Sequence, residues 1–114
     1  MNLETLQYPP GRPRTFRATL HGTVFAGRSE LVEGLKDGDR MLLVPDPPGG
    51  DAPGVWVHVE TGDPVGHLPP EIAGWLWPWL SSGGGARATA ISVHGEDVPS
   101  WRRVVVEVDC AEVG

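Results

Sequence analysis

Apolar and polar residues alternate along several short stretches of the chain. In residues 15–25 every second position on one face is apolar or small, which is the period of a half-buried β-strand: Phe16, Ala18, Leu20, Gly22 and Val24. The same period appears at residues 55–59 and 86–94, and the valine-rich run 101–110 is the most β-prone of all. Further short strands are expected at residues 40–44 and 65–68. Short strands separated by turn residues are typical of an all-β domain.

Two helices are expected between these strands. Residues 30–35 follow a serine N-cap, Ser29, and carry leucines four positions apart, which predicts one or two helical turns. A longer helix begins at Pro69-Pro70 and presents an apolar stripe made of Ile72, Leu76 and Leu80. Pro78 lacks the N–H that would bond to Gly74, so this helix is expected to kink or end there.

Together these elements predict a small OB- or SH3-like β-barrel of five to six strands, with one short and one longer helix. A chain of 114 residues is the size of a single domain. We assign the barrel to residues 15–110, preceded by a loosely held arm at 1–14 and followed by a frayed tail at 111–114. The matched alternation predicts that valines 55, 57 and 59 face inward with valines 104, 106 and 108.

Charge and composition restrict the possible partners. The chain has 16 glycines and 12 prolines, which cluster between apolar runs and are interpreted as turns. The net charge of −6 argues against a general basic surface for nucleic acid. Residues 5–28 nevertheless hold four arginines and no acid: Arg12, Arg14, Arg17 and Arg28. These arginines form either a local basic face or ordinary solvated surface.

A single cysteine and the absence of long apolar runs indicate a cytoplasmic protein. Cys110 has no partner for a disulfide within the chain, which favours a reducing compartment, and it continues the valine face as a small buried residue. No run of 18 apolar residues predicts a membrane span, and residues 1–14 lack the apolar core of a signal peptide.

No known catalytic or metal-binding pattern is present in the sequence. Four histidines, at positions 21, 58, 67 and 94, are spaced too widely to predict a metal site. There is no Ser-His-Asp pattern, phosphate-binding loop or paired-carboxylate motif. We therefore expect neither a metal nor a cofactor, and we expect that the protein is not an enzyme.

A series of short motifs across residues 15–110 resembles the HIRAN domain family. In chain order they are Gly22 with Phe25 and Gly27-Arg28, Leu35-Lys36-Asp37-Gly38-Asp39, a Pro-rich loop ending at Asp51, Val65-Gly66-His67-Leu68-Pro69, and Glu71-Ile72-Ala73. The resemblance implies a small β-barrel with two helices that binds single-stranded DNA or its 3′ end in DNA repair or processing. The chain is most similar to free-standing bacterial members of the family.

The resemblance also implies roles for individual residues. Phe25 corresponds to an aromatic side chain of the family's terminal-nucleotide pocket, Asp51 to its loop aspartate, and His67 to the residue before the Leu-Pro step. Phe25 would stack on a base and Asp51 would accept from a 3′-hydroxyl, while Arg17, Arg28 or His67 would meet phosphate. Each has a plainer alternative: a core ring for Phe25, a loop cap for Asp51 and a packed histidine for His67.

The chain departs from the family's pocket at several positions. A base and an aromatic side chain of DNA-binding members are here Thr23 and Val24, and two loop asparagines are Pro48 and Pro53. A second hypothesis is therefore a module of the same fold that binds a protein partner, or a second copy of itself, without DNA. Helix rotation turns Trp77 away from the apolar stripe, so Trp77 is the expected exposed ring on a partner surface.

Overall fold

The computed structural model describes residues 8–23, 28–46, 54–95 and 97–111. Over these ranges the chain forms β1 (Thr15–Thr19), α1 (Arg28–Gly34), β2 (Arg40–Pro45), β3 (Val55–Val59), β4 (Pro64–His67), α2 (Pro70–Ser81), β5 (Gly85–Val93), the short 3₁₀ helix η1 (Ser100–Arg102) and β6 (Val104–Ala111). The six strands, one short α-helix and one longer α-helix confirm the predicted fold class.

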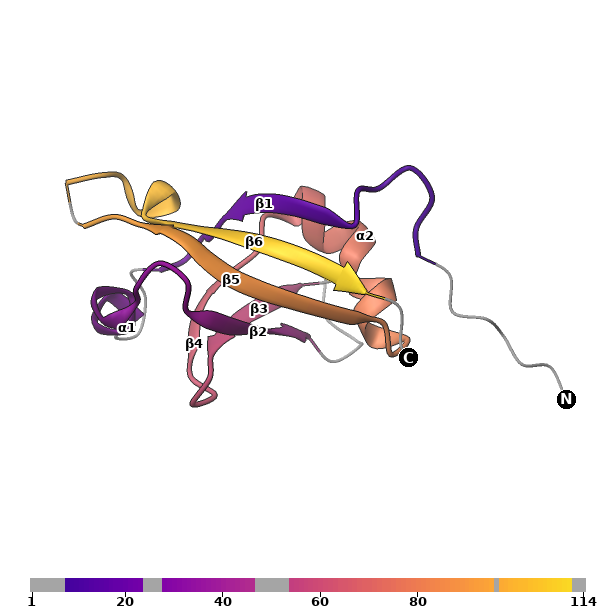
Figure 1. Cartoon of the computed structure of the whole chain (residues 1–114), viewed down its shortest axis with the longest axis horizontal. Helices are drawn as coiled ribbons and strands as arrows, with labels where there is room; N and C mark the ends of the chain where they lie inside the picture. Colours follow the sequence, from indigo (N-terminus) through magenta and orange to yellow (C-terminus); the bar gives the residue numbers. More distant parts are fainter. Residues whose placement is uncertain (1–7, 24–27, 47–53, 96, 112–114) are drawn as a thin grey trace, which may run out of the picture.

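All six described strands belong to one antiparallel sheet with the order β1-β6-β5-β2-β3-β4. The sheet curls into a half-barrel, with α1 and α2 at opposite ends of it (Figure 1). Just beyond β1, His21 pairs with His67 of β4 through two backbone hydrogen bonds, of 2.9 and 3.0 Å. The two edges of the sheet are therefore joined at this one place, which brings the end of β1 beside β4.

The core lies inside the curl and is built mainly from valines. Val55 and Val57 of β3 are fully buried, as are Val104, Val106 and Val108 of β6, so the predicted inward faces of these two strands are confirmed. Val59, at the end of β3, is only partly buried and packs against the edge of this core. Cys110 continues the β6 face and is buried, as expected.

Helix α2 continues beyond the residue where the sequence predicted a kink or an end. Pro70 occupies the first turn, where a backbone N–H would have no partner within the helix. The negative charge of Glu71 in the same turn interacts favourably with the positive end of the helix dipole. Pro78 lies inside the helix, which runs on to Ser81. The carbonyl that Pro78 leaves without a donor belongs to Gly74, which is exposed, so water can satisfy it.

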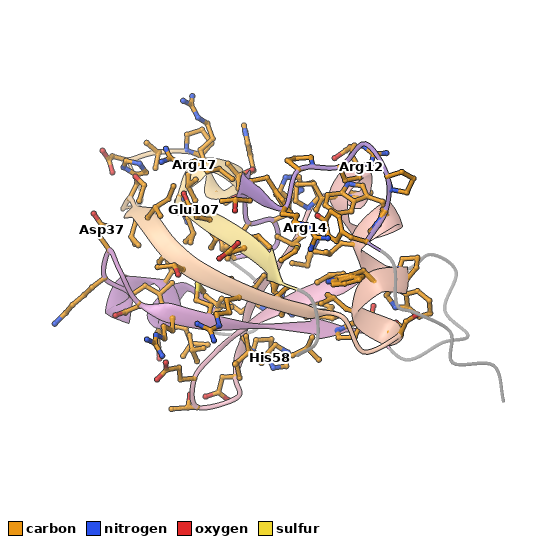
Figure 2. All side chains as sticks on the ribbon, turned by 45° about the vertical axis from the view of Figure 1, so that its right-hand side comes forward. Arg12, Arg14, Arg17, Asp37, His58 and Glu107 are labelled. Carbon is orange, nitrogen blue, oxygen red and sulfur yellow. The ribbon has the colours of Figure 1, made fainter. Side chains whose placement is uncertain are left out.

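The described part of the N-terminal arm packs onto α2. The Tyr8 ring meets Trp79 and Trp75 edge-on, with ring centroids 5.2 and 6.0 Å apart. The Arg14 guanidinium lies 4.7 Å from the centroid of the Tyr8 ring, and that of Arg12 lies 5.5 Å from the centroid of Trp75. Figure 2 shows both arginines beside this helix. Residues 8–14 are therefore held against α2 by aromatic and cation–π contacts.

Burial at this junction makes the stability of the protein sensitive to alkaline pH. Burial raises the pKa of the Cys110 thiol, and burial followed by the hydrogen bond to Cys110 raises the pKa of the Tyr8 hydroxyl. Both groups lose their protons more easily in the unfolded chain, so the stability that they contribute is complete below the unfolded pKa values and is lost as the pH rises above them. Urea denaturation should show a fall in unfolding free energy between about pH 8 and about pH 10.5, and a smaller fall for Cys110→Ala. Parallel pH curves for the two proteins would contradict this assignment.

Candidate functional site

Three aromatic side chains form a row where the two edges of the sheet meet. His21 follows β1, His67 ends β4, and Trp56 lies on β3. The ring centroids of His21 and His67 are 5.9 Å apart, and those of His67 and Trp56 are 5.5 Å apart. His67 is the direct cross-strand partner of both, so the three side chains share one side of the sheet. Trp56 alternates with buried Val55 and Val57, so that side is the outer face of the sheet.

The first residue of α1, Arg28, brings a cation to this row. Its guanidinium carbon lies 4.9 Å from the centroid of the Trp56 ring, and its Nη1 donates to the carbonyl of Gly22 at 2.8 Å. Its Nε is buried and has no hydrogen-bond partner in the part of the chain that the structure describes. Among the described residues no carboxylate forms an ion pair with Arg28, so its charge is not neutralised there.

Gly22 allows the imidazole and the guanidinium to approach each other. Its φ is +70°, and a Cβ at this position would lie 3.1 Å from Nε2 of His67 and 3.3 Å from Nη1 of Arg28. Nδ1 of His67 lies 3.2 Å from the Leu68 carbonyl, which can only accept, so Nδ1 carries the hydrogen. Nε2 of His67 and the guanidinium of Arg28 therefore converge beside Gly22.

Asp46 holds the neighbouring side of the site together. One of its carboxylate oxygens accepts from the indole N–H of Trp56, and its backbone carbonyl accepts from the indole N–H of Trp77 at 2.8 Å. Its backbone N–H donates to the carbonyl of Gly54 at 2.9 Å. The carboxylate of Asp46 thus holds the Trp56 ring in place. The backbone of Asp46 is bonded to Gly54, and these two residues flank segment 47–53.

The predicted site residues have different outcomes. His67 and Arg28 come together beside Gly22, as described above. Arg17 lies on β1, where its Nε is 3.5 Å from a carboxylate oxygen of Glu107, and its side chain is 71% exposed. Figure 2 shows this pair on the paired strands β1 and β6, and within the described ranges no hydrogen bond, ion pair or cation–π contact joins Arg17 to the row of rings. Phe25 and Asp51 lie outside the described residues, so their predicted roles stay predictions.

Thr23 takes no direct part in the row of rings. Its side chain is fully buried, and its hydroxyl donates to the carbonyl of Ser100 at 3.1 Å. It therefore contributes neither a charge nor a ring at a position where DNA-binding HIRAN members carry one of these. The hydrogen bond places η1 next to the residues that precede segment 24–27.

The structure corrects the expectation that Trp77 is an exposed ring. Trp77 is half-buried, packs against the core and donates its indole N–H to Asp46. The helix does not end at Pro78, so Trp77 stays on a regular turn that faces β2 and β3. Among the described residues the exposed tryptophan is Trp101, with 57% of its surface accessible.

His21, Trp56 and Asp46 were not predicted as site residues. Trp56 had a signal in the sequence, because it occupies an outward position in an alternating strand. His21 and Asp46 become recognisable only from cross-strand pairing, since they lie 35 and 10 positions from Trp56 in the chain.

A cleft of about 620 Å³ opens beside Thr23, between α1 and the ends of β5 and β6. Its lining combines apolar side chains with the imidazole of His94 and with charges of both signs, from Glu33, Asp37, Lys36 and Arg103. Because acids and bases alternate there, the cleft selects anions less well than the Arg28–His67 pair does. Over the described part of the chain, no three His, Cys, Asp or Glu side chains are grouped closely enough to hold a metal ion. No helix in those residues has the length and apolarity needed to cross a membrane.

Neither the family models nor the curated protein sequences contain a match to this chain. Among solved structures, it is similar to the crystal structure of the HIRAN domain of human HLTF, with a TM-score of 0.60 and 15% sequence identity. The similarity covers 84% of this chain and 74% of that one. At this level of identity the likeness defines the fold. The chain therefore has a HIRAN-like fold, which confirms the fold that the sequence motifs implied.

Proposed function

We propose that this protein is a non-enzymatic, HIRAN-like module that binds single-stranded DNA or the 3′ end of a DNA strand in DNA repair or processing. The observation that supports this best is the outward row of His21, His67 and Trp56 with the guanidinium of Arg28 beside it. Rings on an outer sheet face next to an unneutralised cation are the combination that proteins use to bind single strands.

The chemistry of the row suits a strand with few contacts. The rings offer stacking faces to bases, and Arg28 offers donors to phosphate oxygens. Because the whole chain carries a net charge of −6, attraction to DNA depends on this local group of side chains. Binding is therefore weak and decreases as salt is added.

The described residues that flank Phe25 and Asp51 in the chain lie at this site. Phe25 lies between Gly22 and Arg28, and both of these take part in the convergence beside His67. Asp51 lies between Asp46 and Gly54, which are hydrogen-bonded to each other. In this proposal Phe25 stacks on the terminal base and Asp51 accepts a hydrogen bond from the 3′-hydroxyl.

Fluorescence polarisation with labelled oligonucleotides ending in a 3′-hydroxyl or a 3′-phosphate tests the proposal. Asp51→Ala should weaken binding to the 3′-hydroxyl strand, and should leave binding to the 3′-phosphate strand unchanged or stronger, because a carboxylate repels phosphate. Phe25→Ala should weaken both by about tenfold, which corresponds to one lost stacking contact. Asp63→Ala, which removes an exposed carboxylate in the β3–β4 turn, is the matched control and should change neither.

Absence of wild-type binding at low salt, up to high micromolar protein, would contradict DNA binding altogether. The second candidate, a module for a protein partner, would then take its place. Two large apolar side chains are exposed in the described residues, Trp101 at 57% and Leu42 at 49%, and they would be the first positions to test for it. If the wild type binds and Asp51→Ala treats both ends alike, the role of Asp51 is wrong and the DNA-binding module stands.

A further inference from the structure

We infer that Arg28, whose guanidinium lies over the ring of Trp56, is a platform on which one nucleobase of the bound strand stacks. This inference rests on the proposed function and adds to it a composite stacking site made of a guanidinium and an indole. Trp56 is the positioning residue of this site, and Arg28 is the residue that touches the base.

The contacts of Arg28 show which part of its guanidinium is available. The edge that carries Nη1 is used by the Gly22 carbonyl, and Nε is buried against the protein. An arginine that serves only phosphate directs its fork of N–H donors toward the ligand. Here part of that fork faces inward, while the guanidinium lies over an aromatic ring. The second face of the guanidinium plane is then the surface offered to a ligand, and planar bases stack on such faces.

The ring beneath Arg28 is itself held in place from two sides. Its indole N–H donates to the carboxylate of Asp46, and the ring of His67 meets it at an interplanar angle of 74°. The backbone of Trp56 pairs with Val44 on one side and His67 on the other, so the residue lies within the sheet. A guanidinium that lies over a fixed ring loses little conformational freedom when a base binds.

The close packing of His67 and Arg28 around Gly22 supports the same arrangement. Any Cβ there would come within 3.0–3.1 Å of the His67 ring and 3.3 Å of Arg28, so a larger residue would displace one of them. Gly22 thus keeps His67 and Arg28 close to each other. The positive charge of Arg28 also attracts the DNA strand, whereas base stacking uses the flat face of its guanidinium.

Exchanging Arg28 for lysine distinguishes the effect of the positive charge on DNA binding from the effect of the flat guanidinium face. Arg28→Lys keeps the positive charge and removes the flat face, so it should weaken DNA binding by about tenfold while the slope of log affinity against log salt stays the same. Arg28→Gln should weaken binding as well and should also reduce the salt slope by about one charge. Affinity for Arg28→Lys equal to that of the wild type would overturn the stacking role and leave a phosphate contact.

Abasic oligonucleotides provide the readout that a purely structural effect would not change. The penalty of Arg28→Lys should disappear when an abasic site replaces the stacked nucleotide at one of the three positions nearest the 3′ end, tested in turn. A penalty that persists at all three positions would overturn the inference, because the lysine would then affect something other than base stacking.

Trp56 is tested with ring-keeping and ring-removing variants. Trp56→Phe should retain most of the affinity, and Trp56→Leu should lose about as much as Arg28→Lys, with no further loss when the two are combined. The matched control is Trp75→Leu, which removes another half-buried tryptophan that carries an arginine over its ring, outside the row. Circular dichroism confirms folding of each variant, and Arg28→Lys decides the matter if Trp56→Leu does not fold.

The outcomes separate this inference from the proposed function. Wild-type protein that binds no DNA overturns both. Wild-type protein that binds DNA, with Arg28→Lys and Trp56→Leu binding equally well, overturns the platform and leaves the DNA-binding module intact.

Discussion

Replacing Trp79 with alanine is expected to lower the free energy of unfolding by about 3–5 kcal/mol. Only 2% of the residue is accessible, and its indole N–H donates to the carbonyl of Gly85 at 3.0 Å. The ring lies so close to Gly84 that a Cβ on that glycine would overlap it, and Tyr8 covers it from the arm. The substitution removes this packing and leaves a cavity at the junction of α2, β5 and the arm.

This loss is large because domains of this size are stable by only about 5–15 kcal/mol. Urea denaturation followed by far-UV circular dichroism measures it, since tryptophan fluorescence changes with the substitution itself. Trp101→Ala is the matched control: that ring is 57% exposed, so its loss should stay within about 0.5 kcal/mol. Similar losses for the two variants would show that Trp79 does not hold α2 to the sheet.

The strands could be predicted because their signal is local. The buried valines of β3 and β6 alternate with partly or fully exposed residues, and this period of two decides which side chains are buried. The most β-prone predicted strand began at Trp101, and β6 begins at Val104, because Ser100–Arg102 form a 3₁₀ turn after Pro99. Local propensity thus placed the strand, and the turn geometry moved its first residue.

The end of α2 shows where a local rule is overridden. A proline removes one hydrogen bond and crowds the preceding turn, so an interior proline usually ends a helix. The apolar residues after Pro78 include Trp79, which is buried and tied to β5, and that packing keeps the last turn helical. The position of Trp77 follows from this, because its ring remains on the helix and reaches Asp46.

The candidate site could be predicted only in part because it is assembled by the joined edges of the sheet. His67 and Arg28 carried a family motif, and the structure brings these two together. His21 follows β1, Asp46 follows β2 and Trp56 lies on β3, and no spacing in the sequence relates the three. What unites them is the pairing of His21 with His67, which closes the curl of the sheet. A contact between the first and fourth strands in chain order is a property of topology.

That closing contact is sensitive to a single added methyl group. Gly66 of β4 is buried, and a Cβ there would lie 2.8 Å from the carbonyl oxygen of His21, 3.2 Å from Cγ2 of Thr23 and 3.3 Å from Cβ of Leu20. The carbonyl of His21 accepts one of the two backbone hydrogen bonds that join the edges, so it cannot move without breaking that bond. Gly66→Ala is therefore expected to lower the unfolding free energy by about 1–3 kcal/mol.

The same substitution should reduce DNA binding by the folded protein, since it separates the rings of His21 and His67 and removes about one stacking contact, or about tenfold in affinity. Gly74→Ala is the matched control, because Gly74 is exposed in α2 and nothing lies within 4 Å of its added Cβ. That change should stabilise the helix by about 0.5–1 kcal/mol and leave DNA binding unaltered. Denaturation curves and polarisation titrations of both variants check this. If Gly66→Ala matches Gly74→Ala in stability, the contact between β4 and the end of β1 does not close the sheet. If Gly66→Ala is less stable but binds DNA like the wild type, this contact supports the fold and does not arrange the site.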